Sequence, residues 1–437
     1  GRRSGGGVWS MREMKDSGIE WIGEIPDDWR IIRNKNAFTC SKELVGEKSE
    51  LTQLLSLTTR GIKKKDINNA EGKLPESFDT YQFVKENDLV MCLFDLDCSA
   101  VFSGISPFDG MISPAYRVLS CKECMEPRYA DYWFRYISNG RKFNHYAKNI
   151  RYTLSYEEFS TLPLLLPKKS EQRRIADYLD CKCSQIDAII ARQQEVIEKL
   201  KAYKLSIITE AVTKGVNPDV PMKDSGVEWI GKIPEHWKMV RLKFLLSHII
   251  DCPHETPIYS ADGDYLVIRT ADQDLGKLRT DEEMYRLDEG EYRNRIRRMP
   301  LEKDDVVYGR EGERWGLACM VPESNKYCLG QRMLQFRCKR DMFSPRFAMW
   351  ALNSKFVYLQ GAVDTIGSTS PHVNISTVRN FLIPVPKISE QQEIAEYIDK
   401  KMSQLDKEIE HRENLICKLN EYKKSLIYEV VTGKQEV

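Results

Sequence analysis

Basic residues interleaved with aromatic and amide residues are the groups in this sequence best suited to binding a polyanion. In the second half of the chain, Tyr292–Arg298 (YRNRIRR) carries four arginines in seven residues, and Arg310, Arg314 and Trp315 lie on a segment flanked by glycines. Lys and Arg side chains neutralise phosphates, and Arg, Asn and Gln can hydrogen-bond to base edges. These clusters predict contacts with nucleic acid.

The candidate contact residues share a basic, amide, hydroxyl or aromatic side chain in a polar segment. In the alternative interpretation, each cluster is only a solvated charged face, which is the commoner case for any single cluster. Clusters in corresponding parts of both halves favour binding. The candidates are Arg60, Lys63, Lys64, Asn149, Arg151, Tyr152, Arg293, Arg295, Arg310, Arg314, Trp315, Arg332, Ser370 and His372.

The sequence contains no recognisable catalytic motif. It has no Asn-Pro-Pro-Phe/Tyr or Asp-Pro-Pro-Tyr tetrapeptide of a methyltransferase and no HExxH. Gly226–Lys232 fits the GxxxxGK pattern of a phosphate loop, but Ile233 stands where Ser or Thr would hold magnesium. In the first half, Glu24 stands at the position that corresponds to Lys232. We therefore interpret these glycines as turn residues, and Trp21, Trp229, Trp29 and Trp237 as packing anchors.

The histidines and cysteines do not form a metal-ligand pattern. The six histidines are scattered, and the twelve cysteines are irregularly spaced. Cys121 and Cys124 form a CxxC motif, but structural zinc needs four ligands and no second pair follows. Residues 1–10 have no apolar core, so we interpret them as an expression-vector remnant or unusual leader, with Met11 as the natural start. We expect reduced thiols, no resident metal or cofactor, and a cytoplasmic location.

Two internal repeats define the organisation of the chain. Met14–Pro26 and Met222–Pro234 match at eleven of thirteen positions, at an offset of 208 residues. Ser170–Asp180 and Ser389–Asp399 match at seven of eleven positions, at an offset of 219. Repeats of this length indicate duplicated domains and not a solenoid. Each copy has an opening motif, a variable segment and a helical segment.

The helical segments are the clearest structural prediction. Apolar residues recur at steps of three and four from Ile175 to Val212 and again from Ile394 to Val430, which is typical of one helix face. Ser170 and Ser389 are the expected N-caps, and Gly215 and Gly433 the expected ends. Some 40 residues give a rod of about 60 Å. The simplest partner for each helix is the other, in a two-stranded coiled coil; in the alternative, each packs on its own domain.

The variable segments are predicted to be mixed α/β. Tyr129–Ile137 and Arg346–Leu359 are expected to be helices. The expected strands are Leu89–Phe94, Tyr116–Leu119, Tyr265–Arg269, Val306–Tyr308 and Leu334–Cys338.

Composition sets limits on these interpretations. The chain has 437 residues, with Lys+Arg 66 and Asp+Glu 65, for a net charge of +1. This balance excludes a uniformly basic protein but leaves room for basic patches offset by acidic helices. No run of about 18 apolar residues is present, so no transmembrane helix is expected.

The complete pattern resembles the specificity subunit of type I restriction–modification systems. The resemblance rests on DSGxEWIGxIPxxW and SEQxxIAxYxD, each present twice, and covers nearly all of residues 11–437. Asp304–Gly312, Gly330–Arg332 and Ser370–Asn374 agree with it. The first copy departs from the second, with Asp95-Leu96-Asp97 taken to stand where Arg310-Glu311-Gly312 stands.

The resemblance implies a mixed α/β (α+β) fold with pseudo-two-fold duplication. Two globular target-recognition domains would be separated and joined by two long helices in an antiparallel coiled coil. The expected boundaries are 11–168 for the first recognition domain, 169–215 for the central helix, 216–387 for the second recognition domain and 388–437 for the C-terminal helix.

The resemblance also implies a non-catalytic subunit that reads a bipartite double-stranded DNA site. The coiled coil would set the spacing of the half-sites and dock two methyltransferase subunits, which bring S-adenosylmethionine. Restriction/translocase subunits would add ATP and Mg2+, and no membrane is involved. Two alternatives remain: a stand-alone methyltransferase or nuclease with unrecognised motifs, and a coiled-coil scaffold that does not read DNA.

Overall fold

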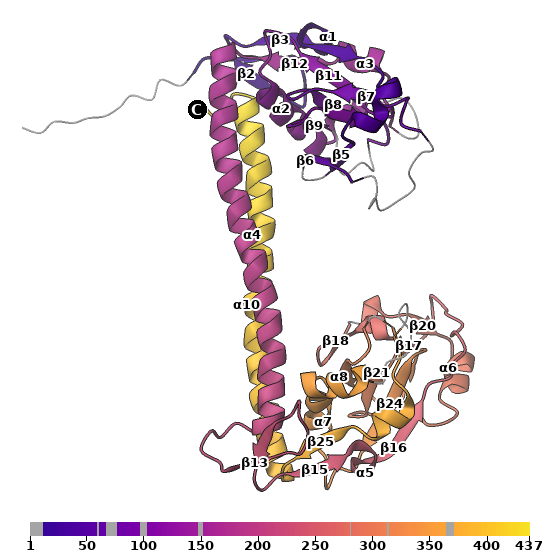
Figure 1. Ribbon diagram of the computed structural model, residues 1–437. Helices are drawn as coiled ribbons and strands as arrows, with labels where there is room; N and C mark the ends of the chain where they lie inside the picture. Colours follow the sequence, from indigo (N-terminus) through magenta and orange to yellow (C-terminus); the bar gives the residue numbers. More distant parts are fainter. Residues whose placement is uncertain are drawn as a thin grey trace, which may run out of the picture. The chain divides into compact units, whose positions relative to one another are not determined.

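The computed structural model describes residues 12–58, 61–66, 77–96, 103–146, 152–279, 281–312, 314–363 and 371–437. The chain divides into two compact units (Figure 1). Unit 1 comprises the chain up to Gln193 together with Asn414–Val437, and unit 2 comprises Gln194–Glu413. Each unit therefore takes its globular part from one copy of the repeat and helical segments from both copies.

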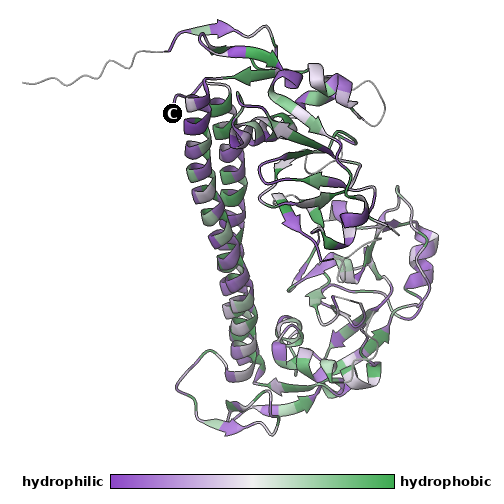
Figure 2. Ribbon diagram, turned by 45° about the horizontal axis from the view of Figure 1, so that its top comes forward, coloured by the Kyte–Doolittle hydropathy of each residue, from purple (hydrophilic) through white to green (hydrophobic). Residues whose placement is uncertain are grey.

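Unit 1 combines short strands with an aromatic-rich helix, α2. Figure 2 shows hydrophobic residues along its strands. Its strands are β1 (Met14–Asp16), β2 (Glu24–Pro26), β3 (Arg30–Arg33), β4 (Phe38–Ser41), β5 (Leu55–Thr58), β6 (Gly61–Lys64), β7 (Gln82–Val84), β8 (Leu89–Met91), β9 (Ser103–Ile105), β10 (Gly110–Ile112), β11 (Arg117–Cys121) and β12 (Pro163–Leu166). Its globular part has the helices α1 (Asn34–Ala37), α2 (Pro127–Asn139) and α3 (Tyr156–Thr161).

Unit 2 repeats this plan with additional small elements. Its strands are β13 (Met222–Asp224), β14 (Lys232–Pro234), β15 (Lys238–Arg241), β16 (Leu246–Asp251), β17 (Tyr265–Ile268), β18 (Gln273–Asp274), β19 (Lys277–Leu278), β20 (Arg286–Leu287), β21 (Val306–Gly309), β22 (Ala318–Met320), β23 (Tyr327–Leu329), β24 (Met333–Cys338) and β25 (Leu382–Val385). Its helices are α5 (Leu242–Leu245), α6 (Glu289–Arg295), α7 (Pro345–Leu352), α8 (Lys355–Ala362) and α9 (Ile375–Arg379).

The same four-stranded antiparallel sheet forms the centre of each unit. Its strand order is β4-β11-β8-β9 in unit 1 and β16-β24-β21-β22 in unit 2. The inner strands β8 and β21 are buried along their whole length, which explains why they are continuous apolar runs in the sequence. The duplication seen in the sequence is therefore a duplication of topology.

Two long helices run through both units and pack against each other: α4 (Lys169–Lys214) and α10 (Ile388–Val431). In unit 1, the Lys423 ammonium lies 2.6 Å from a carboxylate oxygen of Asp187. In unit 2, Lys204 lies 2.5 Å from Asp406. Each pair joins an early residue of one helix to a late residue of the other, so the helices are antiparallel. The two ion pairs are equivalent, because both lysines and both aspartates are 219 positions apart.

Each helix also packs on its own globular part. In unit 1, Arg128 of α2 lies 2.8 Å from Asp177 and from Asp180 of α4. In unit 2, Arg346 pairs with Asp399, and the Trp350 indole donates to the same carboxylate at 2.6 Å. Each long helix therefore packs against the other helix along part of its length and against a globular part elsewhere, so both predicted arrangements occur.

A glutamine in the first turn of each long helix joins it to the globular part. The Gln172 amide donates to the carbonyls of Cys124 and Pro167 and accepts from the Glu126 N–H. Gln391 makes the equivalent three bonds with Met342, Pro386 and Ser344. The first helical bonds run to the Lys168 and Lys387 carbonyls. The prediction that Ser170 and Ser389 are the N-caps is therefore wrong, because the helices begin before them.

The glutamate preceding each glutamine holds a tryptophan of the opening motif. The Trp29 indole donates to Glu171 at 3.1 Å, and the Trp237 indole donates to Glu390 at 3.0 Å. Both rings are fully buried, which confirms them as packing anchors. Trp21 packs against Trp133. Trp229 is 45% exposed, so its prediction as an anchor is wrong.

The predicted helix ends and turn glycines are confirmed. Gly215 and Gly433 follow α4 and α10 with φ of +77° and +72°. This left-handed conformation favours glycine. A side chain at Gly215 would lie 3.3 Å from the Trp237 ring, and one at Gly433 would lie 2.4 Å from Pro26. In each unit, the end of one long helix therefore lies beside the opening motif that the start of the other helix holds.

The predicted strands and helices of the globular parts are found, with one correction. Arg346–Leu359 is not one helix but two, α7 and α8. The Asn353 amide donates to the carbonyls of Ala318 and Met349, and its oxygen accepts from the Ala318 N–H. These side-chain bonds compete with helix continuation and end α7 at Leu352.

Candidate nucleic-acid interface

The central sheet of unit 2 brings several candidate residues to one end. Strands β16 and β21 both run antiparallel to β24, so Asp251 and Gly309 lie opposite Leu334 and Met333. Arg310 directly follows β21 and Arg332 directly precedes β24. The Arg310 N–H donates to the Arg332 carbonyl at 3.0 Å. The topology thus places two arginines that are 22 positions apart in sequence on adjacent strand ends.

The segment containing His372 joins the same end. The Val373 N–H donates to the Arg310 carbonyl at 2.9 Å, and the Gly312 N–H donates to the Pro371 carbonyl at 3.0 Å. Arg314 belongs to the same loop, where its side chain is 44% exposed and lies 3.7 Å from Asp274. Arg310, Arg314, Arg332 and His372 therefore belong to one connected set of loops.

Arg310 is the arginine of this set that is held in place most firmly. Its side chain is 9% exposed, and its Nε lies 3.3 Å from Asp251. Asp251 also pairs with His254 at 3.0 Å. Arg332 is exposed and has a φ of +70°. This left-handed backbone is unusual for a residue other than glycine, and such strain is found more often at functional positions.

Two further polar side chains at this end were missed from the sequence. Arg298 donates to the Asp251 carbonyl at 2.9 Å, and Gln331 donates to the His254 carbonyl at 2.6 Å. Arg298 was visible as the last arginine of the YRNRIRR cluster. Gln331 was visible in the GQR motif. Together with Arg310, Arg314 and Arg332, they define what we call the arginine end of the sheet.

Arg295 and Trp315 lie inside the domain and not on its surface. Arg295 is 5% exposed. Its guanidinium donates to the carbonyls of Leu329, Glu255 and Pro253, at 2.8, 2.7 and 3.3 Å respectively. Trp315 is 7% exposed and stacks on Tyr358, with ring centroids 4.4 Å apart. Both positions favour support of the loops over contact with a ligand. Arg293 is exposed and pairs with Glu289 on α6.

The candidates of unit 1 lie on two separate segments. Lys63 and Lys64 are exposed on β6, and the Lys64 ammonium lies 4.6 Å from the centre of the Phe108 ring. Tyr152 is half-exposed, and its carbonyl accepts from the Leu96 N–H at 3.2 Å. Tyr152 thus lies beside the segment that follows β8, much as the His372 segment lies beside Arg310. Arg60, Asn149, Arg151 and Ser370 lie outside the described residues.

The hydrogen bonds correct the alignment of the two copies after the central strands. The Leu154 N–H donates to the Leu93 carbonyl at 2.8 Å, and the Val373 N–H makes the equivalent bond to Arg310. Leu93, and not Asp95, is therefore the counterpart of Arg310. The sequence comparison was shifted by two positions because the motif shared by the copies stops within the strand.

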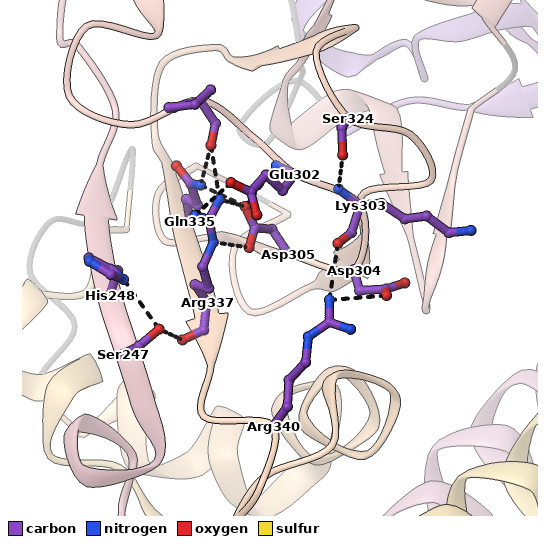
Figure 3. A network of polar contacts seen from close by, with 11 residues as sticks. Ser247, His248, Glu302, Lys303, Asp304, Asp305, Ser324, Gln335, Arg337 and Arg340 are labelled. Carbon is purple, nitrogen blue, oxygen red and sulfur yellow. Dashed lines mark hydrogen bonds and ion pairs between the residues drawn. The ribbon is translucent and has the colours of Figure 1, made fainter.

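The acidic motif before β21 is a structural network (Figure 3). Arg337 donates from two nitrogens to Asp305, both at 2.8 Å, and Gln335 donates to the same carboxylate at 2.7 Å. The hydrogen bonds that Arg337 donates to Asp305 raise the pKa of Arg337 against the opposing effect of burial. Asp304 and its counterpart Asn87 have φ of +71° and +70°. The motif shapes a turn and fixes the neighbouring strand, which explains its presence in both copies.

The metal and CxxC hypotheses can be compared with the described residues. These residues contain no group of three or more His, Cys, Asp or Glu residues that could hold a metal ion. Burial raises the pKa of Cys121 to about 12, so its side chain is a neutral thiol. Within the described ranges, no helix is long and apolar enough to cross a membrane.

Known proteins of one kind match this chain over most of its length. Residues 234–420 match the family model described as the type I restriction modification DNA specificity domain. The type I restriction enzyme MjaVIII specificity subunit of Methanocaldococcus jannaschii is 22% identical over 435 residues, covering 94% of each protein. The EcoBI specificity subunit of Escherichia coli is also 22% identical, covering 97% of this chain and 90% of its own. The chain is thus similar to type I specificity subunits over most of its length, and its second half matches the family model of their DNA specificity domain.

The fold is found in a solved structure from work on complex assembly and conformational transition of the type I R-M system. The TM-score is 0.68 at 16% identity, covering 94% of this chain and 99% of that chain. The mixed α/β fold with two long paired helices is thereby confirmed. The matching family model is described as a DNA specificity domain, and these matches favour neither the stand-alone enzyme nor the scaffold.

Proposed function

We propose that each globular part of this specificity subunit reads one half of a bipartite DNA site. The observation that carries this proposal is the pairing of one sheet topology with two different sets of loops. A shared frame with different loops suits a protein that applies one docking geometry to two base sequences. The globular parts would correspond to the target-recognition domains 11–168 and 216–387, and the helices to 169–215 and 388–437.

The contacts of unit 2 centre on the arginine end of the sheet. Arg310 and Arg332 lie at adjacent strand ends, where Asp251 holds the Arg310 side chain and a backbone hydrogen bond from Arg310 holds the Arg332 carbonyl. Residues that read base edges need such a rigid frame. Arg293, Arg298, Arg314, Gln331 and His372 would contact phosphates or bases around them. In unit 1, the DNA contacts would come from Lys63, Lys64 and Tyr152, together with Arg60, Asn149 and Arg151. In unit 2, Ser370 remains a predicted DNA contact. Arg295 and Trp315 would hold the loops.

The helix pair would act as the spacer between half-sites and as the platform for two methyltransferase subunits. The equivalent ion pairs Lys204–Asp406 and Asp187–Lys423 support a single antiparallel register. Adding four residues to both helices would extend each by about 6 Å. At about 34 Å per helical turn of DNA, this extension predicts a target gap longer by one or two base pairs. Retention of the parent gap would contradict the spacer role.

The remaining chemistry would come from partner subunits. The methyltransferase subunits would supply S-adenosylmethionine and methylate adenine. Restriction/translocase subunits would supply ATP and Mg2+ for translocation and cleavage. The complex would work in the cytoplasm, where its DNA substrate lies.

Sequencing of methylated adenines tests the proposal. We expect cells that carry this chain and its methyltransferase partner to methylate one bipartite sequence that is unmethylated when either protein is absent. Arg332→Ala should reduce methylation and alter the requirement in one half-site only, since a lost base contact costs about 1–3 kcal/mol. Arg340→Ala is the matched control, because Arg340 is exposed and lies beyond the opposite end of β24. A continuous target, or methylation by the chain alone, would overturn the proposal.

A further inference from the structure

One exposed stripe is identical on the two long helices. Four residues at spacings of four, three and four recur at an offset of 219, one set in each unit. The set, which we call the Lys-Tyr-Ser-Glu stripe, is Lys199, Tyr203, Ser206 and Glu210 in α4 and Lys418, Tyr422, Ser425 and Glu429 in α10. This spacing places the four side chains along one line on a helix surface.

The stripe is largely exposed in both copies. Tyr203 and Tyr422 are 56% and 57% exposed, which is unusual for large aromatic side chains on a polar helix. The other exposed positions of α4 from Gln194 to Glu210 all differ from their counterparts in α10. These differing pairs are Gln194/Glu413, Glu195/Asn414, Glu198/Cys417, Lys201/Asn420 and Ala202/Glu421. Solvent exposure alone therefore does not keep the two helices alike.

Packing of the helix pair does not explain the stripe either. Each stripe residue of α4 immediately precedes a less exposed residue of the interhelical face, such as Lys204 or Ile207. The stripe thus borders that face without forming it. Its contacts within each helix also differ. Glu210 pairs with Lys214, whereas Glu429 accepts a hydrogen bond from Ser425. No shared contact within the helices requires the four residues to match.

We propose that the Lys-Tyr-Ser-Glu stripe is a docking site used twice, once in each unit, by two copies of the same protein. A partner that binds in two copies must find the same residues in both places, whereas residues that read different DNA halves need not match. Tyrosine is enriched among residues that dominate interface energetics. The partner would offer a pocket for the ring, an acidic group facing the lysine and a basic group facing the glutamate. The contact extends along the helix for about 16 Å.

This inference rests on the proposed function, in which the partner present in two copies is the methyltransferase subunit. The full-length chain is co-purified with that subunit, and the complex is weighed by native mass spectrometry. We expect two methyltransferase subunits on the unaltered chain, one on Tyr203→Ala or Tyr422→Ala, and none on the double variant. Each substitution should weaken its own site about 30-fold, as expected for a dominant interface residue.

The controls separate docking from folding and from the proposed function. Ile189→Ala removes an exposed apolar residue of α4 whose counterpart is Glu408, and it should keep both subunits. Hydrogen exchange of α4 and α10 checks that the tyrosine variants stay helical. Two subunits on the folded double variant would overturn the stripe alone. An unaltered chain that binds no methyltransferase subunit would overturn the proposed function instead.

Discussion

The two units share a frame but differ at the end of the central sheet where the candidate contacts gather. The sheet registers of β8 with β11 and of β21 with β24 align Leu93 with Arg310 and Ala115 with Arg332. Unit 1 therefore has a small or apolar residue at each position where unit 2 has Arg310 or Arg332. The exposed lysines of unit 1 lie elsewhere, on the β5–β6 hairpin. Two domains of one fold have placed positive charge on different elements.

The positions that agree between the units hold the frame together. Glu171 and Glu390 bind the buried tryptophans, Gln172 and Gln391 join the helices to the globular parts, and a pair of lysine–aspartate contacts joins the helices. Duplication has kept the residues whose partners are also duplicated. Buried positions of the central sheet also vary, as at the aligned pair Met91 and Tyr308. The shared junctions, and not an unchanged core, therefore preserve the geometry that the proposed reading of two different sequences requires.

The largest effects are expected at the buried tryptophans that the frames share. Trp29→Ala and Trp237→Ala should each lower the free energy of unfolding of their own unit by about 3–5 kcal/mol, because each removes a buried ring. Hydrogen exchange measured separately in each unit reports the loss. Trp229→Ala, at an exposed position, is the control and should cost less than about 0.5 kcal/mol. Losses that differ by several kcal/mol would show that the two junctions are not equivalent.

A smaller but one-sided effect is expected at Arg295, which has a structural task only in unit 2. Arg295→Ala should cost about 2–4 kcal/mol, because it leaves buried carbonyls without donors. Unit 1 should be unaffected. Arg293→Ala, two residues away and exposed, should cost less than about 0.5 kcal/mol. Reduced DNA binding by a fully stable Arg295→Ala variant would instead support the sequence-based assignment of Arg295 as a contact.

The equivalent ion pairs of the helices should differ in strength. Asp406 is 25% exposed and accepts from both Lys204 and Lys277, whereas Asp187 is 57% exposed and pairs with Lys423. Asp406→Asn should therefore cost about 1–2 kcal/mol and Asp187→Asn less than about 1 kcal/mol. Thermal unfolding followed by hydrogen exchange in each unit measures both. Equal losses would show that Lys277 contributes nothing to unit 2.

The contacts of Asp406 predict that the stability of unit 2 depends on pH. Burial opposes ionisation of Asp406, but hydrogen bonds from Lys204 and Lys277 outweigh it and lower its pKa from the ordinary value of 3.8. Its stabilising contribution is therefore present above that value and is lost as the pH falls through the lower pKa of the folded state. The stability of unit 2 should fall more steeply in acid for the unaltered chain than for Asp406→Asn.

The architecture could be predicted from the repeats in the sequence. The grouping of the candidate residues into one site could not, because it depends on how the strands pair. Matching motifs with fixed offsets predicted the duplicated domains, and periodic apolar residues predicted both long helices. Arg310 and Arg332 could be chosen as basic residues, but only the pairing of β21 with β24 brings them together. Arg295 could not be told from Arg293, because burial of one arginine in a polar heptapeptide is decided by distant carbonyls.

The smallest expected effects concern the two serines at the starts of the long helices. Ser170→Ala and Ser389→Ala should each change the unfolding free energy by less than about 0.5 kcal/mol, whereas loss of a true N-cap costs about 1 kcal/mol. In the structure, the side chains of the two glutamines make the stabilising hydrogen bonds at the helix starts. Gln172→Ala and Gln391→Ala should therefore each lower the unfolding free energy by about 1–3 kcal/mol, because they leave backbone groups unpaired. Chemical unfolding monitored by hydrogen exchange at the helix starts compares the four variants. A loss of about 1 kcal/mol on substitution of either serine would show that this serine is the N-cap and that its helix begins one or two residues later. A loss at only one serine would show that the two units differ at a position where their sequences are identical.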